Sequence, residues 1–412
     1  MPSRPSARAA LVTAAVVLGA LWALAAVLLW RSRIPGDLVL PRLDEADFSS
    51  TAESGRAEAY ERVVVWVALG SILAQIVTLA VTAWRAPRTA RGIGLGPIGT
   101  GVVIGLVTML AVWAAGIPFT AVLTWWDRRH DLSEEGYVEA VFAPYAELFG
   151  LTVTALVTIV VVMWLARKLG RLWWLAGAPA FAAIAAAFAF LLPYLLTLGA
   201  EQPADPGLRA EIVRLEDATG AGPTPVYVEE VSDYTSLPNA YAAGFGPSQR
   251  VVLWDTLLDG RFTDGEVAIV AAHELGHVAR DHVWKGLAWF ALLALPLLAA
   301  VSEVARLRGG VERPENIPLA ALALVLAGLC LAPVQNAVSR HFEKEADWIA
   351  LEATRDPAAM QTLFAKFSEE TLSDPTPPSW TQALFGSHPS NLERIAMAEA
   401  WALEFTPTEE KP

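Results

Sequence analysis

Seven apolar segments constrain the fold of this chain more than any other feature of its sequence. A helix needs about 20 mostly apolar residues to cross the hydrocarbon core of a bilayer, and polar stretches separate runs of about that length here. The segments are residues 9–30, 63–84, 98–126, 148–165, 172–198, 283–304 and 317–334. Tryptophans lie near many of their ends, as is typical of a membrane–water interface. The sequence therefore predicts a multi-pass integral membrane protein, in the cell membrane if the host is bacterial, with seven transmembrane helices.

The composition agrees with this prediction and excludes other classes of protein. Hydrophobic residues make up 54% of the chain and charged residues only 18%, against about 25% charged residues in average soluble domains. The net charge of −13 argues against a nucleic-acid partner, because such partners require a basic face. Cys330 is the only cysteine, so neither an intramolecular disulfide nor a thiolate metal cluster can form.

Two polar stretches, residues 201–282 and 335–412, are unlike the rest of the chain because they are charged and punctuated by Pro and Gly. Together they hold about 160 residues, enough for one domain. We therefore expect a five-span region over residues 1–200, two further transmembrane helices within residues 283–334, and one domain built from both polar stretches. The distribution of Lys and Arg among the short loops favours an N-terminus inside the cell and both polar stretches outside.

The sequence His-Glu-Leu-Gly-His, which begins at His273, is the strongest chemical signal. On a helix, residues i and i+4 share a face, so His273 and His277 can reach one metal ion while Glu274 accepts a proton from metal-bound water. Thr263 and Glu266 have the spacing of a capping box, which predicts that a helix begins just after Thr263.

A hydrolytic zinc site needs a third protein ligand and an open position for water. Without a usable cysteine, this ligand must be His, Asp or Glu. Glu343 and Asp347 follow the seventh apolar segment and would share one face of a helix. Glu343 is then the ligand and Asp347 the partner of a ligating imidazole, while His341 is the competing third ligand.

Two other histidines receive roles from their neighbours. His388 precedes Pro389 and a capping box formed by Ser390 and Glu393, which places its imidazole at the mouth of a short helix. Such a side chain is suited to donate to a developing oxyanion. His282 lies where the metal-binding helix meets the sixth apolar segment, and we expect it to act as a cap or at the membrane interface.

These residues resemble the type I CAAX prenyl protease family of integral-membrane zinc endopeptidases, with the HtpX-type membrane proteases as more distant relatives. The motifs that carry the resemblance are Asn239-Ala240-Tyr241, residues 250–258, residues 273–277, residues 339–347, and Ser387-His388-Pro389 with Arg394. The resemblance implies one zinc ion held by His273, His277 and Glu343, with Glu274 as the general base.

The same resemblance implies roles for four further residues and for the fold. Asn239 and His388 would contact the substrate backbone or the oxyanion, and Asp347 and Arg394 would support the site. The implied fold class is a mainly α membrane protein with seven transmembrane helices and a gluzincin-like α+β zinc protease domain formed by residues 201–282 and 335–412. The family places this domain on the cytoplasmic side, whereas the loop charges favour the outside, so the membrane face stays open.

The predicted function is an integral-membrane zinc metalloendopeptidase. It would use a zinc-activated water to hydrolyse peptide bonds of peptides or proteins that are membrane-associated or lipid-modified. We expect residues 250–255 to form a short strand, and a substrate peptide to pair with a sheet edge there or at residues 239–243. Residues 373–389 are rich in Pro, Ser and Thr and are candidates for a lid.

Two other functions could also account for a metal-binding motif in a membrane protein. A site-2-type intramembrane protease also uses His-Glu-X-X-His, but within a membrane helix, whereas this motif lies in a charged stretch before the sixth apolar segment. The alternative from another class is a non-catalytic membrane transporter or scaffold with a structural metal site. Transporters often carry ionisable residues within their spans, and these apolar segments are nearly free of them.

Overall fold

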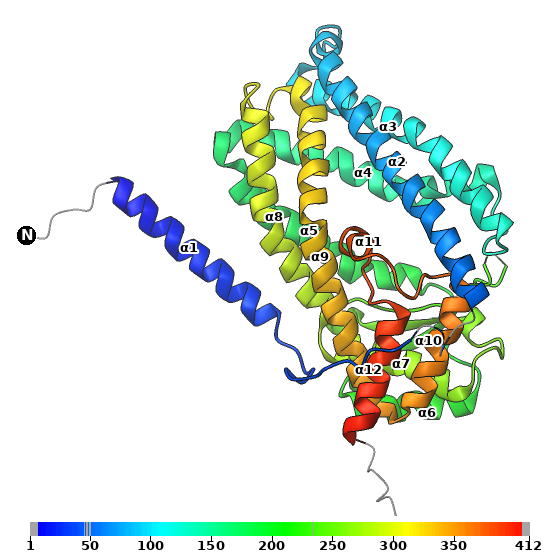
Figure 1. Cartoon of the computed structure of the whole chain (residues 1–412). Coiled ribbons are helices and arrows are strands. Elements are labelled where there is room, and N and C mark those ends of the chain that lie inside the picture. The colour runs from blue at the N-terminus through cyan, green and yellow to red at the C-terminus, as the bar shows by residue number, and fades with distance from the viewer. Residues whose placement is uncertain (1–6, 45, 47, 49–50, 234, 406–412) are drawn as a thin grey trace, which may run out of the picture.

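A bundle of long helices is joined to a smaller polar domain that carries a short β-sheet. The computed structural model describes residues 7–44, 46, 48, 51–233 and 235–405. Its strands are β1 (Val226–Glu229), β2 (Ala240–Ala243) and β3 (Arg250–Trp254). Its α-helices are α1 (Ala7–Leu29), α2 (Thr51–Ala90), α3 (Gly96–Arg129), α4 (Tyr137–Leu169), α5 (Trp173–Leu196), α6 (Pro206–Thr219), α7 (Asp264–Ala279), α8 (His282–Arg306), α9 (Ile317–Thr354), α10 (Pro357–Thr371), α11 (Ser379–Leu384) and α12 (Asn391–Phe405). Figure 1 shows α2, α3, α4, α8 and α9 in the bundle, with α6, α7, α10 and α12 at its lower end.

Five helical runs in the described part of the chain are long and apolar enough to cross a membrane. They are Gly55–Ala90, Gly96–Arg129, Thr152–Leu196, His282–Arg306 and Pro314–Thr354. The sequence predicted seven separate spans. Most of the fourth and fifth of these falls within the single run Thr152–Leu196, where only the 3₁₀ turn Gly170–Leu172 joins α4 to α5. The described apolar part of the first predicted span is the shorter helix Val16–Leu29.

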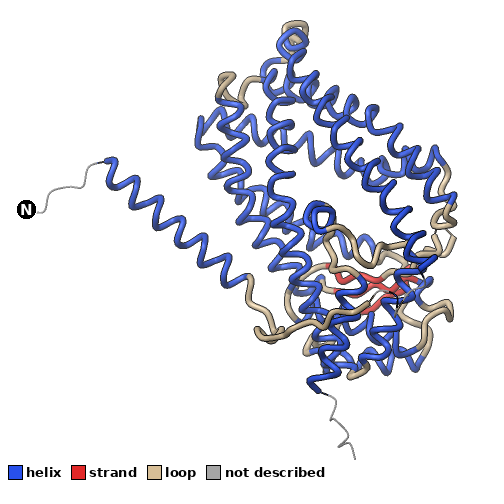
Figure 2. The backbone as a smooth tube through the Cα atoms, viewed as in Figure 1, coloured by secondary structure: helices blue, strands red, loops and turns tan. Residues whose placement is uncertain are grey.

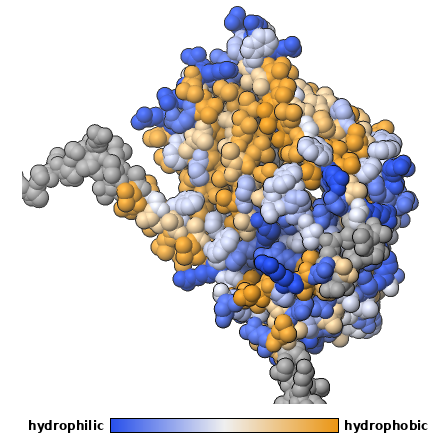
Figure 3. Space-filling model, viewed as in Figure 1, coloured by the Kyte–Doolittle hydropathy of each residue, from blue (hydrophilic) through white to orange (hydrophobic). Residues whose placement is uncertain are grey.

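The surface of the bundle is apolar where a membrane would surround it. Large hydrophobic side chains of α2 face outward, among them Trp66, Leu73 and Val77. Figure 3 shows apolar residues across the middle of the bundle and hydrophilic residues at its tip and over the polar domain, on the face in view. An exposed apolar surface of this extent is typical of contact with lipid rather than water.

Helix α9 connects the bundle to the polar domain (Figure 1). Its 38 residues extend over about 57 Å at 1.5 Å per residue, which exceeds the hydrocarbon thickness of about 30 Å. The apolar first half of α9 ends near the predicted limit of the seventh span, and its second half is buried in the polar domain. One continuous helix therefore carries residues such as Glu343 from the membrane region into the candidate site.

The sheet has the strand order β1–β3–β2, with β1 parallel and β2 antiparallel to β3. Figure 2 shows the strands below the helix bundle, in the polar domain. Ala240 pairs with Leu253, and Ala243 pairs with Arg250. The prediction of a strand at residues 250–255 is confirmed by β3. Its suggested role as an edge for substrate pairing is wrong, because β3 lies between two partners and its backbone groups are used by both. The other suggested site, residues 239–243, coincides with the outer strand β2.

Helix α7 lies in the centre of the polar domain. Its start is fixed as predicted, because the Thr263 side chain accepts from the Glu266 backbone and the Glu266 side chain accepts from the Thr263 backbone. Most of the helix is buried, and its apolar residues join a core that includes Leu253 of β3, Trp348 of α9 and Phe364 of α10. Because both histidines of the predicted motif lie on this helix, the packing of α7 fixes their direction.

The crossing of α7 over α9 depends on a glycine. A Cβ atom on Gly276 would lie 3.3 Å from both the Cα and the carbonyl oxygen of Ala346 and 3.4 Å from the Cβ of Ile349. These neighbours are rigid parts of α9 and cannot move aside easily. The missing side chain therefore allows the backbones of the two helices to approach each other within the site region.

We expect Gly276→Val to lower the melting temperature of the detergent-purified protein, because the added methyl groups must separate α7 from α9. Overpacking of this kind costs about 1–3 kcal/mol. Intrinsic tryptophan fluorescence during heating measures the shift. Gly286→Val is the matched control, since a Cβ at Gly286 of α8 meets no atom within 4 Å. Equal melting temperatures for the two variants would contradict the close crossing.

Candidate metal centre

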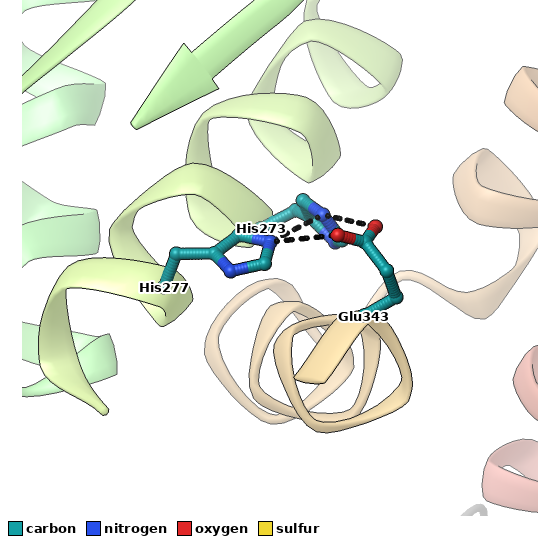
Figure 4. Close-up of side chains that lie close together, drawn as sticks. All are labelled: His273, His277 and Glu343. Atoms are coloured by element: carbon teal, nitrogen blue, oxygen red, sulfur yellow. Dashed lines mark hydrogen bonds and ion pairs between the residues drawn. The ribbon is translucent and has the colours of Figure 1, made fainter. Parts of the chain in front are cut away.

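The two histidines of the motif project from one face of α7 toward each other (Figure 4). Their Nε2 atoms lie 3.1 Å apart, and both imidazoles are largely removed from solvent. At this distance the two Nε2 atoms cannot both carry a hydrogen directed at the other atom, because the two hydrogens would collide. The pair therefore presents at least one lone pair to a shared point, as two ligands of one ion would.

Glu343 of α9 completes this group from the opposite side (Figure 4). Its Oε2 lies 3.3 Å from the Nε2 of His273, and its Oε1 lies 3.5 Å from the Nε2 of His277. Four tetrahedral ligands at the usual zinc distances of 2.0–2.2 Å are about 3.3 Å from one another. The spacing of these three side chains and their nitrogen and oxygen donors therefore fit a zinc ion.

Asp347 lies one turn further along α9, behind His273. Its Oδ1 lies 2.8 Å from the Nδ1 of His273, and its Oδ2 accepts from the Nε of Arg394 at 2.8 Å. The Arg394 guanidinium also stacks on the ring of Phe364, 3.9 Å from its centroid. With Nδ1 bonded to a carboxylate, His273 keeps its Nε2 directed at Glu343, the arrangement that the sequence proposed for Asp347.

His341, the competing third ligand, is turned away from this group. Its Nε2 lies 2.8 Å from the carbonyl oxygen of Trp30, and its ring stacks on that of Trp30 with centroids 4.2 Å apart. His341 and Glu343 are two positions apart on the helix, which at 3.6 residues per turn places them on different faces. The structure therefore brings Glu343, and not His341, to the two histidines.

Burial and neighbouring charges shift the pKa values of the three α7 residues in different directions. Burial raises the pKa of Glu274, only partly opposed by the nearby His273. Burial lowers the pKa of His277 to about 3. For His273 the same burial is outweighed by hydrogen bonds to Asp347 and Glu343, which raise its pKa to about 10. In the metal-free protein His273 therefore holds a proton between the carboxylates, while His277 is neutral.

A cavity of about 610 Å³ opens beside the group and is lined by Glu274, Asn239 and His388. The Nδ1 of His388 lies 2.8 Å from the Oε2 of Glu343, while 63% of the side chain is exposed. The Asn239 Oδ1 accepts from the Ala240 backbone at 2.9 Å. Each residue assigned to the site from the sequence therefore lies at the metal group, behind it or on the wall of this cavity.

The outer walls of the cavity come from the membrane helix α2 and from the segment predicted as a lid. Tyr60, Glu61 and Val64 of α2 line one side. Ser373, Pro377 and Ser387 line another, so the segment 373–389 lies along the cavity. The site thus opens between the bundle and the polar domain.

Two residues near the metal group were missed from the sequence, His282 and Glu345. His282 was expected to act as a cap or at the membrane interface, but its Nδ1 lies 2.9 Å from the Nδ1 of His277. Its Nε2 lies 3.0 Å from the Oε2 of the fully buried Glu345. The chain reverses between α7 and α8 at Asp281, which has a left-handed φ of 53°. The available signal was a histidine five residues after His277, just beyond a helix end.

Residues 203–402 match the sequence model of a protein family that is described as peptidase family M48. The metalloprotease YhfN of Bacillus subtilis is 31% identical over 58% of this chain and 59% of its own length. A CAAX prenyl protease 1 homologue of Oryza sativa is 30% identical over 47% of both chains. This chain thus spans about half the length of these two relatives.

Other relatives are covered more completely. A protease HtpX homologue of Acidiphilium cryptum is 30% identical over 48% of this chain and 74% of its own length. The crystal structure of S. mikatae Ste24p superposes with a TM-score of 0.72 and 16% identity, covering 92% of this chain and 96% of that one. The fold is therefore that of Ste24p.

The long apolar helices and this fold make the chain a multi-pass integral membrane protein. Residues 203–402, which match the family model, include α7 and the second half of α9 with every side chain of the metal group. The chain belongs to peptidase family M48.

Proposed function

We propose that the protein is an integral-membrane zinc metalloendopeptidase that cleaves membrane-associated or lipid-modified peptides. One observation carries the proposal: His273, His277 and Glu343 converge from two helices while the buried Glu274 lines the adjoining cavity. A purely structural metal site needs neither a carboxylate beside it nor an open space. The arrangement therefore favours the enzyme over a membrane transporter or scaffold.

His273, His277 and Glu343 would hold the zinc ion, with Asp347 and Arg394 fixing the orientation of His273. When bound, zinc supplies Lewis-acid chemistry and lowers the pKa of a water molecule that it contacts. The donor set of two imidazoles and one carboxylate is that of catalytic zinc sites which keep one position open.

Glu274 would be the general base. Its carboxylate takes a proton from the attacking water, holds it in a buried setting that raises the carboxyl pKa, and passes it to the leaving amine. The Nδ1 of His388 donates to Glu343, so its Nε2 is the ring nitrogen left for the developing oxyanion, to which it would donate as an imidazolium. Asn239 lies across the same cavity and would contact the substrate backbone.

The outer strand β2 provides a place for the substrate backbone. It pairs with β3 on one side, and its neighbour Asn239 lines the cavity. An extended peptide that pairs with the outer side of β2 passes beside Glu274, because β2 packs against α7 and the Ala242 backbone donates to the Glu274 carboxyl group.

The class of substrate follows from the position of the cavity and from the relatives. Membrane helix α2 supplies one wall, so a peptide held near the bilayer by a lipid or an apolar anchor reaches the site directly. CAAX prenyl protease homologues among the relatives support lipid-modified peptides.

The proposed architecture behind this activity has seven transmembrane helices. Five would lie within residues 1–200 and two within residues 283–334. Residues 201–282 and 335–412 would form one gluzincin-like zinc protease domain. The burial of α7 against both β3 and α9 supports the joint domain.

Removing the proposed base tests the chemistry. We expect Glu274→Gln to lower the rate of cleavage of a quenched peptide by about 10²–10⁴-fold while the zinc content stays unchanged, because Gln keeps the shape but cannot take the proton. Activity is measured on detergent-purified protein and zinc by atomic spectroscopy. Full activity in the variant would remove Glu274 from the mechanism.

A substitution of His388 distinguishes a role in oxyanion stabilisation from a role in metal binding. We expect His388→Ala to reduce kcat by about 10²–10³-fold and to retain one zinc ion per chain, since its Nδ1 contacts Glu343 rather than the shared point of the ligands. Loss of zinc from this variant would instead identify His388 as a ligand.

Metal binding should release a proton. The pKa of His273 near 10 in the metal-free protein means that a proton occupies the site up to about that pH, while His277 with its pKa of about 3 is already neutral. We expect roughly one proton to be released per zinc ion at pH 7.5, and the zinc affinity to rise with pH until His273 is neutral.

Calorimetric titrations of the metal-free protein in buffers of different ionisation enthalpy count the released protons. The Glu274→Gln variant serves as a control for a proton held by that carboxyl group. Zinc binding without proton release, with an affinity that does not change between pH 7 and 9, would contradict the protonated His273.

A further inference from the structure

Two consecutive hydrogen bonds, which we call the relay, lead from His277 away from the proposed metal position. The Nδ1 of His277 lies 2.9 Å from the Nδ1 of His282, and the Nε2 of His282 lies 3.0 Å from the Oε2 of Glu345. Three elements contribute one residue each: α7, the first turn of α8, and α9.

The chemistry of imidazole determines which ring nitrogen carries the hydrogen at each step of the relay. The Nε2 of His277 faces His273 and Glu343, so as a metal ligand it must keep a lone pair there and carry its hydrogen on Nδ1. This hydrogen can only point at the Nδ1 of His282, which must then accept. His282 in turn carries its hydrogen on Nε2 and donates it to the Glu345 carboxylate.

The Glu345 end of the relay is held in place by several contacts. The Glu345 side chain is fully buried, and its Oε1 also accepts from the Nε of Arg280 at 2.7 Å and from the backbone nitrogen of Arg33 at 2.8 Å. The His282 ring stacks on Phe342, with centroids 4.5 Å apart and planes within 10°. Neither the carboxylate nor the intervening ring is therefore free to turn.

The first ligand has a comparable support. His273 bonds to Asp347 directly, whereas His277 reaches a buried carboxylate through one additional imidazole. A carboxylate behind a ligating histidine fixes the tautomer and the direction of the ring. The two carboxylates lie two residues apart on α9, so one helix supplies Glu343 and the support for both histidines.

We propose that His282 and Glu345 are positioning residues that hold His277 in its metal-binding tautomer and orientation. The inference rests on the proposed zinc site, but concerns residues that do not touch the ion. It predicts that the acceptor at the position of the His282 Nδ1 matters for metal affinity more than the volume of the ring.

Two substitutions of His282 distinguish the effect of the hydrogen-bond acceptor from the effect of the ring volume. His282→Phe keeps a ring that can stack on Phe342 but removes the acceptor, whereas His282→Asn loses the ring and can place its Oδ1 near the Nδ1 position. We expect the zinc dissociation constant of the full-length, metal-free protein to rise about 10–100-fold in His282→Phe and to stay close to that of the parent in His282→Asn.

Competition with a chromogenic chelator measures the affinity, and the visible absorption of the Co²⁺-loaded protein reports the ligand geometry independently of activity. His341→Ala is the matched control, because this histidine lies on α9 but bonds to Trp30, and it should bind as the parent does. His277→Ala removes a proposed ligand and should abolish tight binding.

The outcomes distinguish the relay from the metal site itself. Parent-like affinity and Co²⁺ absorption in His282→Phe, or weakened binding in His282→Asn but not in His282→Phe, would overturn the positioning role while leaving the proposed function intact. Parent-like binding by His277→Ala would overturn the proposed ligand set and the relay together. If one His282 variant does not fold, the other still decides, because the relay and a packing role predict opposite results for each.

Discussion

The close crossing of α7 and α9 is the contact on which the candidate site depends. Gly276 lets the two backbones approach at Ala346. On each helix, the side chains that must meet lie three residues before this contact and directly after it. His273 and His277 come from α7, and Glu343 and Asp347 from α9. Because each helix is itself fixed, α7 by its capping box and the sheet and α9 by its continuation into the bundle, the separation of the ligands is set before any ion binds.

The same crossing connects the membrane region to the chemistry. Helix α9 passes from an apolar bundle into a buried polar network within one uninterrupted element. The cavity beside Glu274 is consequently bordered by the membrane helix α2 on one side and by the polar domain on the other. The substrate that we propose, a peptide anchored at the bilayer, would reach the site between these two parts.

Local patterns in the sequence were sufficient for parts of this structure. The four-residue spacing of His273 and His277 and the capping box at Thr263 depend only on helix geometry, and the structure has the expected helix there. The choice between Glu343 and His341 depended on which face of α9 meets α7, which spacing along one helix does not determine. The resemblance to a known family favoured Glu343, and the structure places it at the histidines.

Other features required the tertiary structure. The central place of β3 depends on the return of β2 beside it, and the contact between His282 and His277 depends on a left-handed residue, Asp281, that reverses the chain. The most direct test of the metal centre is X-ray absorption at the zinc edge on the zinc-loaded parent protein. We expect only nitrogen and oxygen neighbours at about 2.0–2.1 Å, with the multiple scattering of two imidazoles. A sulfur neighbour near 2.3 Å, or a third imidazole in place of the carboxylate, would contradict the ligand set of His273, His277 and Glu343.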